Sequence, residues 1–219
     1  MTATPAGPDP AGPDPAGADP AGSVAAADPA GSVAAGGLHG DAVRVLSAWR
    51  ATTEEGDLAR KRALDLLADG PVAMTRAHRA GHVTASALVV DPHGKVLLCL
   101  HGRLNKWMQL GGHCEQSDRT LAEAALREAT EESGISGLRI DPDPIDVDVH
   151  EVRCGAAEGT PATESVHYDV RFLVRSPQGA TEQISDESAD LAWFAPDALP
   201  SPLASATARQ IPPALTRLP

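Results

Sequence analysis

The chain has 219 residues, enough for one sizeable domain with extensions. Its formal net charge of −12 argues against a nucleic-acid partner, because such proteins carry a basic stripe. No apolar run approaches bilayer-spanning length, and the N-terminus lacks a basic region followed by an apolar stretch, so we expect neither a membrane partner nor secretion. The three cysteines (Cys99, Cys114 and Cys154) lack CxxC spacing, which predicts neither a disulfide framework nor a zinc site and favours a reducing cytoplasm.

Residues 1–37 form a low-complexity segment rich in Ala, Gly, Pro and Asp. The unit Ala-Gly-Pro-Asp-Pro occurs at Ala6 and Ala11, and a longer unit starts at Asp19 and again at Asp28. Such a composition cannot bury a core, and proline removes backbone hydrogen-bond donors. We therefore predict a disordered tail, with a role in binding a partner as the alternative.

Residues 38–76 are predicted to form two helices. Asp41 is placed to cap the first, and Trp49 is among its apolar positions. The second follows two threonines, and Gly70 and Pro71 are expected to end it. We expect both helices to pack against the following domain or a partner subunit, which leaves a homodimer open. A DNA-reading helical domain is the alternative, and the scarcity of basic residues disfavours it.

From residue 77 to 213 the pattern indicates a larger domain. Residues 82–90 alternate and then become apolar, as a core strand does, and a turn at residues 91–94 leads to a hairpin partner at residues 95–100. A final strand is predicted at residues 191–194. A helical turn begins at residue 196, and a helix is expected over residues 203–211, before two prolines.

Two segments of this domain, residues 145–150 and 166–174, alternate strictly. Each therefore has an apolar face and a polar face, and the polar positions are Asp146, Asp148, His150, His167, Asp169 and Arg171. If the two strands pair, these side chains line one surface. That surface is either a solvated or salt-bridged face, or a wall that binds substrate or a further ligand. The candidate substrate-binding residues are accordingly Asp148, His150 and His167, with His113 beside the glycine pair.

The most unusual local feature is a short acidic helix that follows Gly111 and Gly112. Residues three and four apart share a helix face, so Glu128, Glu131 and Glu132 crowd one patch. This patch lies near the helix C-terminus, where the macrodipole disfavours negative charge. Either the patch is a solvated acidic face, or it binds a hard divalent cation, which prefers oxygen ligands.

Residues 127–135, Arg-Glu-Ala-Thr-Glu-Glu-Ser-Gly-Ile, resemble the Nudix box, whose pattern is G-x5-E-x7-R-E-U-x-E-E-x-G-U with U aliphatic. Small Ala129 stands at the first aliphatic position, and Leu110 replaces the proline usual before the glycines. The resemblance implies an α/β fold, a Nudix-like α/β/α sandwich with a mixed sheet over residues 77–213. The helical segment and the disordered tail would precede it.

The resemblance also implies a reaction, the hydrolysis of a diphosphate linkage in a nucleotide or nucleoside-diphosphate derivative. The implied cofactor is Mg²⁺, with Mn²⁺ as a substitute. The implied metal ligands are Glu128, Glu131, Glu132 and the carbonyl of Gly112 or of its neighbour. Arg127 would order the box by pairing with a loop carboxylate. The general base would be Glu131, Glu115 or Glu187.

The loop before the helix departs from the family pattern. The acidic position after the glycines is Asp118 instead of Glu, and one extra residue separates it from Arg127. The sequence therefore leaves open whether Asp118 or Glu115 takes the place of the family's loop glutamate. A bacterial Nudix subgroup is similar in its Gly-Gly-His loop, its His-x-Thr-Ala-Ser segment and its Asp-Val-Asp-Val-His segment, which favours a subgroup trait.

Two other functions are compatible with the same fold. One is a regulator that binds a nucleotide without cleaving it, and the other is an isopentenyl-diphosphate isomerase. The box glutamates are present and no basic C-terminal domain follows, so hydrolysis is favoured over regulation. Cys114 lies near the box, but the surrounding pattern of the isomerase is missing.

Overall fold

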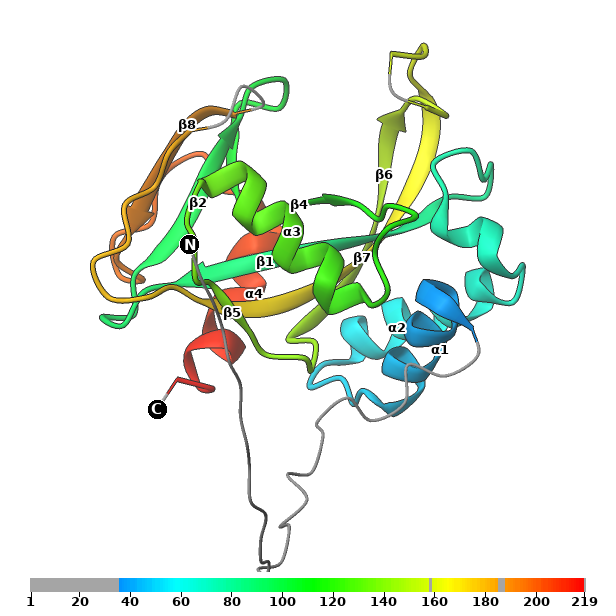
Figure 1. Cartoon of the computed structure of the whole chain (residues 1–219), viewed down its shortest axis with the longest axis horizontal. Helices are drawn as coiled ribbons and strands as arrows, with labels where there is room; N and C mark the ends of the chain where they lie inside the picture. The colour runs from blue at the N-terminus through cyan, green and yellow to red at the C-terminus, as the bar shows by residue number, and fades with distance from the viewer. Residues whose placement is uncertain (1–35, 158, 185–187, 219) are drawn as a thin grey trace, which may run out of the picture. The chain divides into compact units, whose positions relative to one another are not determined.

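A computed structural model describes residues 36–157, 159–184 and 188–218 (Figure 1). The predicted disordered tail lies outside the described residues except for its last two positions, and so does Glu187. The helices are α1 (Gly37–Ala48), α2 (Glu54–Leu67), the 3-10 turn η1 (Pro71–Met74), α3 (Leu121–Ser133) and α4 (Ser205–Leu215). The strands are β1 (His82–Val90), β2 (Val96–His101), β3 (Lys106–Met108), β4 (Leu110–His113), β5 (Arg139–Ile140), β6 (Asp146–Cys154), β7 (Thr163–Arg175) and β8 (Ser188–Phe194).

The strands form one mixed sheet. Its main path runs β3-β2-β1-β7-β5, while β4 pairs with β1, β6 with β7 and β8 with β2. The central pair, β1 and β7, is parallel, and the other pairs are antiparallel. The predicted mixed sheet is therefore confirmed, as is the predicted hairpin of β1 with β2.

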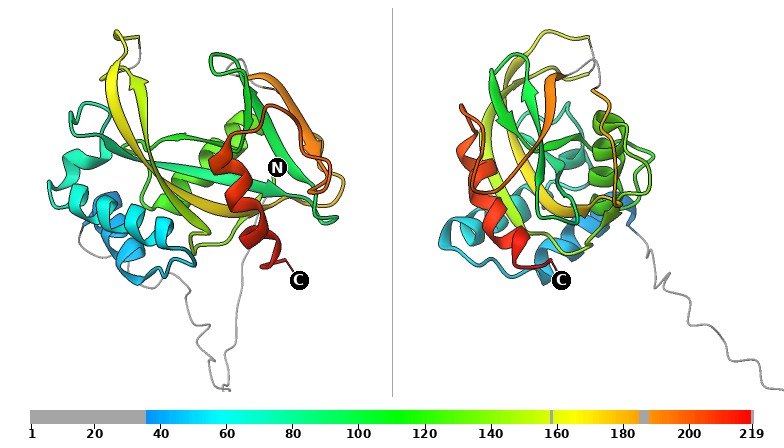
Figure 2. Two further views of the ribbon diagram at one scale, coloured as in Figure 1. Left: turned by 180° about the vertical axis from the view of Figure 1, so that it is seen from behind. Right: turned by 90° about the vertical axis from the view of Figure 1, so that its left-hand side faces the viewer.

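The sheet has an apolar layer on each face, and β1 is therefore buried on both faces. Val83, Ala85, Ala87 and Val89 belong to the core shared with α3, while Leu88 and Val90 belong to a second core shared with α4. The two helices accordingly lie on opposite faces, as Figures 1 and 2 show. This arrangement confirms the predicted α/β/α sandwich.

The N-terminal helices pack against this domain, as expected. Leu46 is fully buried in the core shared with α3, and the indole of Trp49 donates a hydrogen bond to the carbonyl of Pro144 at 2.7 Å. The prediction that Asp41 caps α1 is wrong, because the helix begins at Gly37 and Asp41 lies within it. Its carboxylate instead accepts a hydrogen bond from the backbone N–H of Leu121, the first residue of α3, at 2.9 Å.

The C-terminal helix is longer than predicted. It runs through Pro212 and Pro213, although proline was expected to end it. Ile211 and Ala214 are both buried in the second core, so packing outweighs the lost backbone bonds. The extra turn completes a helix whose earlier residue Arg209 reaches the polar face of the sheet.

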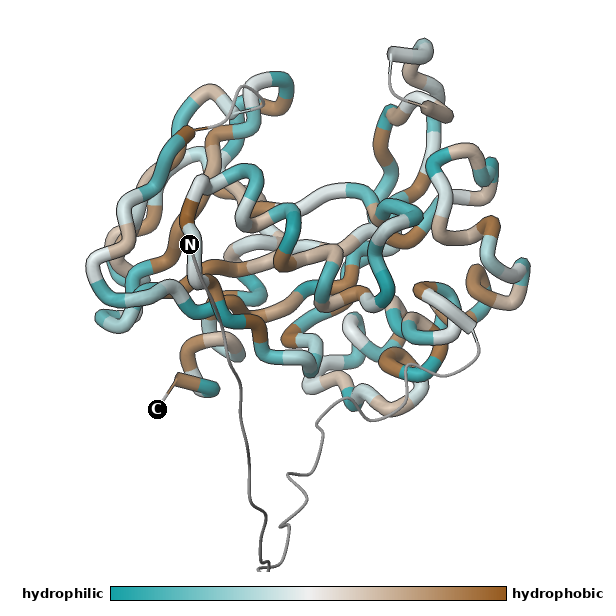
Figure 3. The backbone as a smooth tube through the Cα atoms, viewed as in Figure 1, coloured by the Kyte–Doolittle hydropathy of each residue, from teal (hydrophilic) through white to brown (hydrophobic). Residues whose placement is uncertain are grey.

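Apolar and polar residues are interspersed along the helices (Figure 3). Buried apolar residues of α1, α2 and α3 belong to the first core, and buried apolar residues of α4 belong to the second. Among the residues that the structure describes, no helix is both long enough and apolar enough to cross a membrane.

Candidate active site

The acidic helix α3 is fixed at both ends. The Thr120 hydroxyl caps its N-terminus by accepting the N–H of Glu123 at 3.0 Å. At its other end Gly134 takes the left-handed conformation, with φ of 66°, and donates its N–H to the carbonyl of Thr130. The cap therefore holds the last two turns, which carry the box glutamates, in a regular helix.

Two of these glutamates lie against the paired glycines of β4. The Gly111 N–H donates to a carboxylate oxygen of Glu132 at 3.2 Å. A Cβ at Gly112 would lie 2.8 Å from the carboxylate of Glu128, so a larger residue there would displace that carboxylate. Glu131, whose side chain is 59% exposed, points outward beside Arg127. The structure thus brings the four predicted metal-binding residues to one junction of helix and strand.

Arg127 holds the loop and the helix together. Its guanidinium donates to both carboxylate oxygens of Asp118, each at 3.1 Å, and to the carbonyl of His113 at 2.9 Å. It also donates to Glu128 at 3.1 Å and to Glu131 at 3.0 Å. Burial alone would lower the pKa of Arg127, but these carboxylates outweigh burial and raise it above its usual value. The arginine is therefore a permanent cation within an acidic site.

The loop carboxylates take different positions. Asp118 is buried, pairs with Arg127 through both oxygens and also accepts the backbone N–H of Glu115 at 2.7 Å. The side chain of Glu115 is 59% exposed, and its nearest oxygen lies 3.7 Å from Arg127. In this geometry Asp118 is the loop partner of the arginine, and Glu115 is left facing solvent.

The opposite face of the sheet carries a buried polar network centred on Asp169. This carboxylate accepts hydrogen bonds from Thr84 at 3.1 Å, from Ser86 at 2.6 Å and from Arg171 at 2.7 Å. Burial would raise the pKa of Asp169, but Arg171 and the Ser86 hydroxyl outweigh burial and lower it. The His-x-Thr-Ala-Ser segment thus has a structural role, which is to satisfy a buried carboxylate.

Asp148 and His150 belong to the edge of this network. Asp148 pairs with Arg171 at 3.2 Å, with Arg209 of α4 at 2.8 Å and with His150 at 2.9 Å. Burial would raise the pKa of Asp148, but its hydrogen bonds and the two guanidinium groups lower it well below its ordinary value. Asp146 is shared between the same two arginines, yet its burial raises its pKa. The face is salt-bridged, and Arg209 contributes to it although the strand pattern does not predict that residue.

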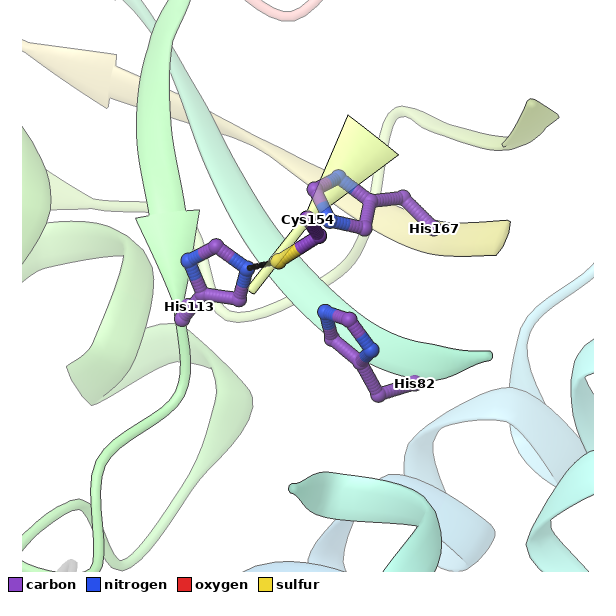
Figure 4. A group of neighbouring side chains, drawn as sticks. All are labelled: His82, His113, Cys154 and His167. Atoms are coloured by element: carbon purple, nitrogen blue, oxygen red, sulfur yellow. Dashed lines mark hydrogen bonds between the residues drawn. The ribbon is translucent and has the colours of Figure 1, made fainter. Parts of the chain in front are cut away.

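The other two candidate substrate-binding residues, His113 and His167, gather with His82 and Cys154 (Figure 4). The four ligand atoms of this histidine–cysteine cluster all lie within 4.8 Å of one another. His82 and Cys154 were not predicted as site residues. The signal that could have found His82 is the pairing register of β1, because His82 is opposite His167 and His113 is opposite Thr84. Cys154 is opposite Thr163 at the end of β6, so the register gives no such signal for it.

Comparison with known proteins places this chain in a family. The NUDIX domain family matches residues 80–215. A NUDIX-family hydrolase from Clostridium perfringens is 22% identical, with 64% of this chain and 99% of that chain covered and a TM-score of 0.48. A MutT NUDIX hydrolase from Burkholderia pseudomallei is 25% identical, with 59% of this chain and 95% of that chain covered and a TM-score of 0.45. No curated protein matches. Since the family match covers more than half of the chain, the chain belongs to the Nudix hydrolase family.

Proposed function

We propose that this protein is a Mg²⁺-dependent hydrolase that cleaves a diphosphate linkage in a nucleotide or a nucleoside-diphosphate derivative. Members of the family generally use divalent metal ions. The observation that supports the proposal most is the convergence of Glu128 and Glu132 on Gly111 and Gly112, with Glu131 beside them.

The donor set fits a hard cation. Glu128, Glu131 and Glu132 offer carboxylate oxygens, and Mg²⁺ typically takes one or two carboxylates and retains several waters. Arg127 pairs with Glu128 at 3.1 Å and with Glu131 at 3.0 Å, so it offsets part of the negative charge of the donor set. The bound cation would neutralise the diphosphate, orient it and acidify the attacking water.

The chain's own residues would set the geometry of the reaction. Arg127, held by Asp118, fixes the direction of the Glu128 and Glu131 side chains, and Glu132 fixes the turn at Gly111. Preorganised charges of this kind lower a barrier because they need no rearrangement as the reaction proceeds. Arg127 acts through the glutamates and is a positioning residue in this proposal.

For the general base we retain Glu131, Glu115 and Glu187 as candidates. Glu131 and Glu115 both have side chains that are 59% exposed, so both can reach a water molecule at the surface of the site. Glu115 is held less tightly, at 3.7 Å from Arg127. Glu115→Gln tests this role if its pH–rate profile loses the acidic limb while the affinity for Mg²⁺ is unchanged.

The central test replaces the glutamates one at a time. Glu131→Gln and Glu132→Gln should each lower Mg²⁺-dependent turnover on the order of 100-fold or more while leaving the fold intact, because each removes a charged metal ligand. The matched control is Glu123→Gln, which changes an exposed glutamate on the same helix that pairs with Arg119. Unchanged turnover in both variants would contradict the metal assignment.

The substrate within the diphosphate class is found by screening. A panel of nucleoside triphosphates including oxidised forms, ADP-sugars, dinucleotides and coenzyme A should be assayed for phosphate or pyrophosphate release with Mg²⁺ and with Mn²⁺. One of the solved structures that this chain resembles, from Streptococcus suis, is named an ADP-ribose pyrophosphatase, which makes ADP-ribose a useful member of the panel. Tight nucleotide binding without release of product across the panel would favour the regulator.

A further inference from the structure

The histidine–cysteine cluster (His82, His113, His167 and Cys154) is separate from the acidic junction. Because side chains alternate along a strand, His82 of β1 lies on the same face of the sheet as Thr84, and so does His113 of β4, which is opposite Thr84. Gly112 faces Glu128 on the other side of the sheet. The four side chains come from four different strands, β1, β4, β7 and β6. Figure 4 shows them pointing toward one another, with the Cys154 sulfur between the rings.

The rings are close but make few hydrogen bonds. His82 and His113 stack with centroids 5.0 Å apart, and His167 lies edge-on to both, at 4.8 Å and 5.0 Å. Among the described residues, one hydrogen bond joins two members of the cluster, Cys154 Sγ and His113 Nε2, at 3.3 Å. The cluster therefore brings together inward-directed ligand atoms, and two of its side chains, His82 and His167, have ring nitrogens without a partner among the described residues.

These unsatisfied atoms are costly unless something binds them. Both ring nitrogens of His82, which is fully buried, and Nε2 of His167 have no hydrogen-bond partner among the residues that the structure describes. An unpaired buried polar group costs about 1–3 kcal/mol, and native folds contain few of them. A fold that gathers several at one point, on well-paired strands, indicates a ligand that accepts their lone pairs.

The chemistry of the four side chains also suits a metal ion. A neutral imidazole has a free lone pair on one ring nitrogen, and a cysteine that loses its proton offers its sulfur.

We propose that His82, His113, His167 and Cys154 bind a Zn²⁺ ion, in a centre distinct from the magnesium site. Three imidazole nitrogens and one thiolate suit zinc, which prefers tetrahedral N and S ligands at about 2.0–2.3 Å. In that geometry neighbouring ligand atoms lie about 3.4 Å apart. The ligand atoms here lie within 4.8 Å of one another, so the most distant pair needs to close by about 1.4 Å.

Four protein ligands leave no open position, so the centre is structural. Binding converts the Cys154 thiol to a thiolate, and the displaced proton goes to solvent, so one proton is released for each zinc bound. The ion would tie β4 to β1, β6 and β7 directly after the glycine pair. It would thereby hold the strand against which Glu128 and Glu132 pack.

The test measures the metal content of the full chain. The protein is first incubated with zinc, and unbound zinc is then removed in a buffer with excess Mg²⁺. The Mg²⁺ occupies the carboxylates of the acidic junction, so that they do not retain zinc. Elemental analysis should find about one zinc per chain. Cys154→Ser and His113→Asn should weaken zinc binding by at least about 100-fold. Matched controls are Cys99→Ser, which changes a buried thiol that contacts Gln109, and His150→Asn, which changes a histidine 5.6 Å from His167.

A second readout keeps the test decisive if a ligand variant does not fold. Wild-type protein stripped by a chelator is titrated with Co²⁺, which should give the visible bands of a tetrahedral ion and a thiolate-to-metal absorption. About one proton should be released per ion. Glu132→Gln should retain full zinc binding, so failure of the proposed hydrolase would not affect the result. Wild-type protein that takes up no zinc, or ligand variants that keep it, would overturn the proposal.

Discussion

Removing the carboxylate of Asp118 should destabilise the fold far more than removing that of Glu115. Asp118→Ala deletes two hydrogen bonds to the guanidinium of Arg127 and the acceptor of a backbone N–H. Loss of one partner of a buried ion pair costs about 3–5 kcal/mol. Arg127 keeps its bonds to Glu128, Glu131 and the His113 carbonyl, so we expect the lower end, about 3 kcal/mol.

Urea unfolding measures this difference. With a slope of about 2 kcal/mol/M, the midpoint of Asp118→Ala should fall by about 1.5 M. Glu115→Ala removes an exposed carboxylate 3.7 Å from the arginine and should lower the free energy of unfolding by less than about 0.5 kcal/mol. Asp118→Asn, which keeps one acceptor oxygen, should lie between them. Equal shifts for the two alanine variants, or a larger one for Glu115→Ala, would refute the assignment of Asp118 as the arginine's partner.

Three further predictions concern other parts of the chain. Gly112→Ala should lower turnover at least about tenfold with little change in melting temperature, because the new Cβ displaces only the Glu128 side chain. Gly111→Ala should destabilise the fold instead, because Gly111 has a φ of 141° and lies against the backbone of Ser86. Asp148→Asn should lower the free energy of unfolding at pH 7, because the fold lowers the pKa of Asp148 and is therefore stabilised by its ionised form. The difference between the variant and the wild type should shrink as the pH falls below the ordinary carboxyl pKa of 3.8. A deficit constant from pH 7 to pH 3 would contradict that reasoning. Leu46→Ala should lower the free energy of unfolding by about 2–5 kcal/mol, because this side chain is fully buried. The variant should still unfold in one transition if α1 belongs to the hydrolase core, and a separate early transition would contradict that.

Most strands were predictable because their side chains alternate between two environments. The polar positions Asp148 and His150 fall opposite Asp169 and His167, as expected if the two segments pair. The helix ends were less predictable. Asp41 has the residue type of a cap, yet it serves the N-terminus of α3, at Leu121, because tertiary packing extends α1 past it. Local propensity does not contain that contact.

The acidic site and the histidine–cysteine cluster differ in how far sequence reasoning reaches them. Glu128, Glu131 and Glu132 lie within one helix, so their proximity follows from the helical period. His82, His113, His167 and Cys154 meet only through the registers of β1 with β7, of β1 with β4 and of β6 with β7, which depend on contacts distant in the chain. Cysteine spacing alone predicted no zinc site, because three of the four ligands proposed here are histidines.

The short strand β4 has a thermodynamic consequence. Its Gly112 lies against the carboxylate of Glu128 on one side, and its next residue, His113, enters the proposed zinc centre on the other. If two ions bind to the same four-residue strand, their binding equilibria are linked, and linkage is reciprocal. The factor by which zinc changes the affinity for magnesium must equal the factor by which magnesium changes the affinity for zinc. Titrating each ion in the presence and absence of the other would therefore measure one coupling free energy twice.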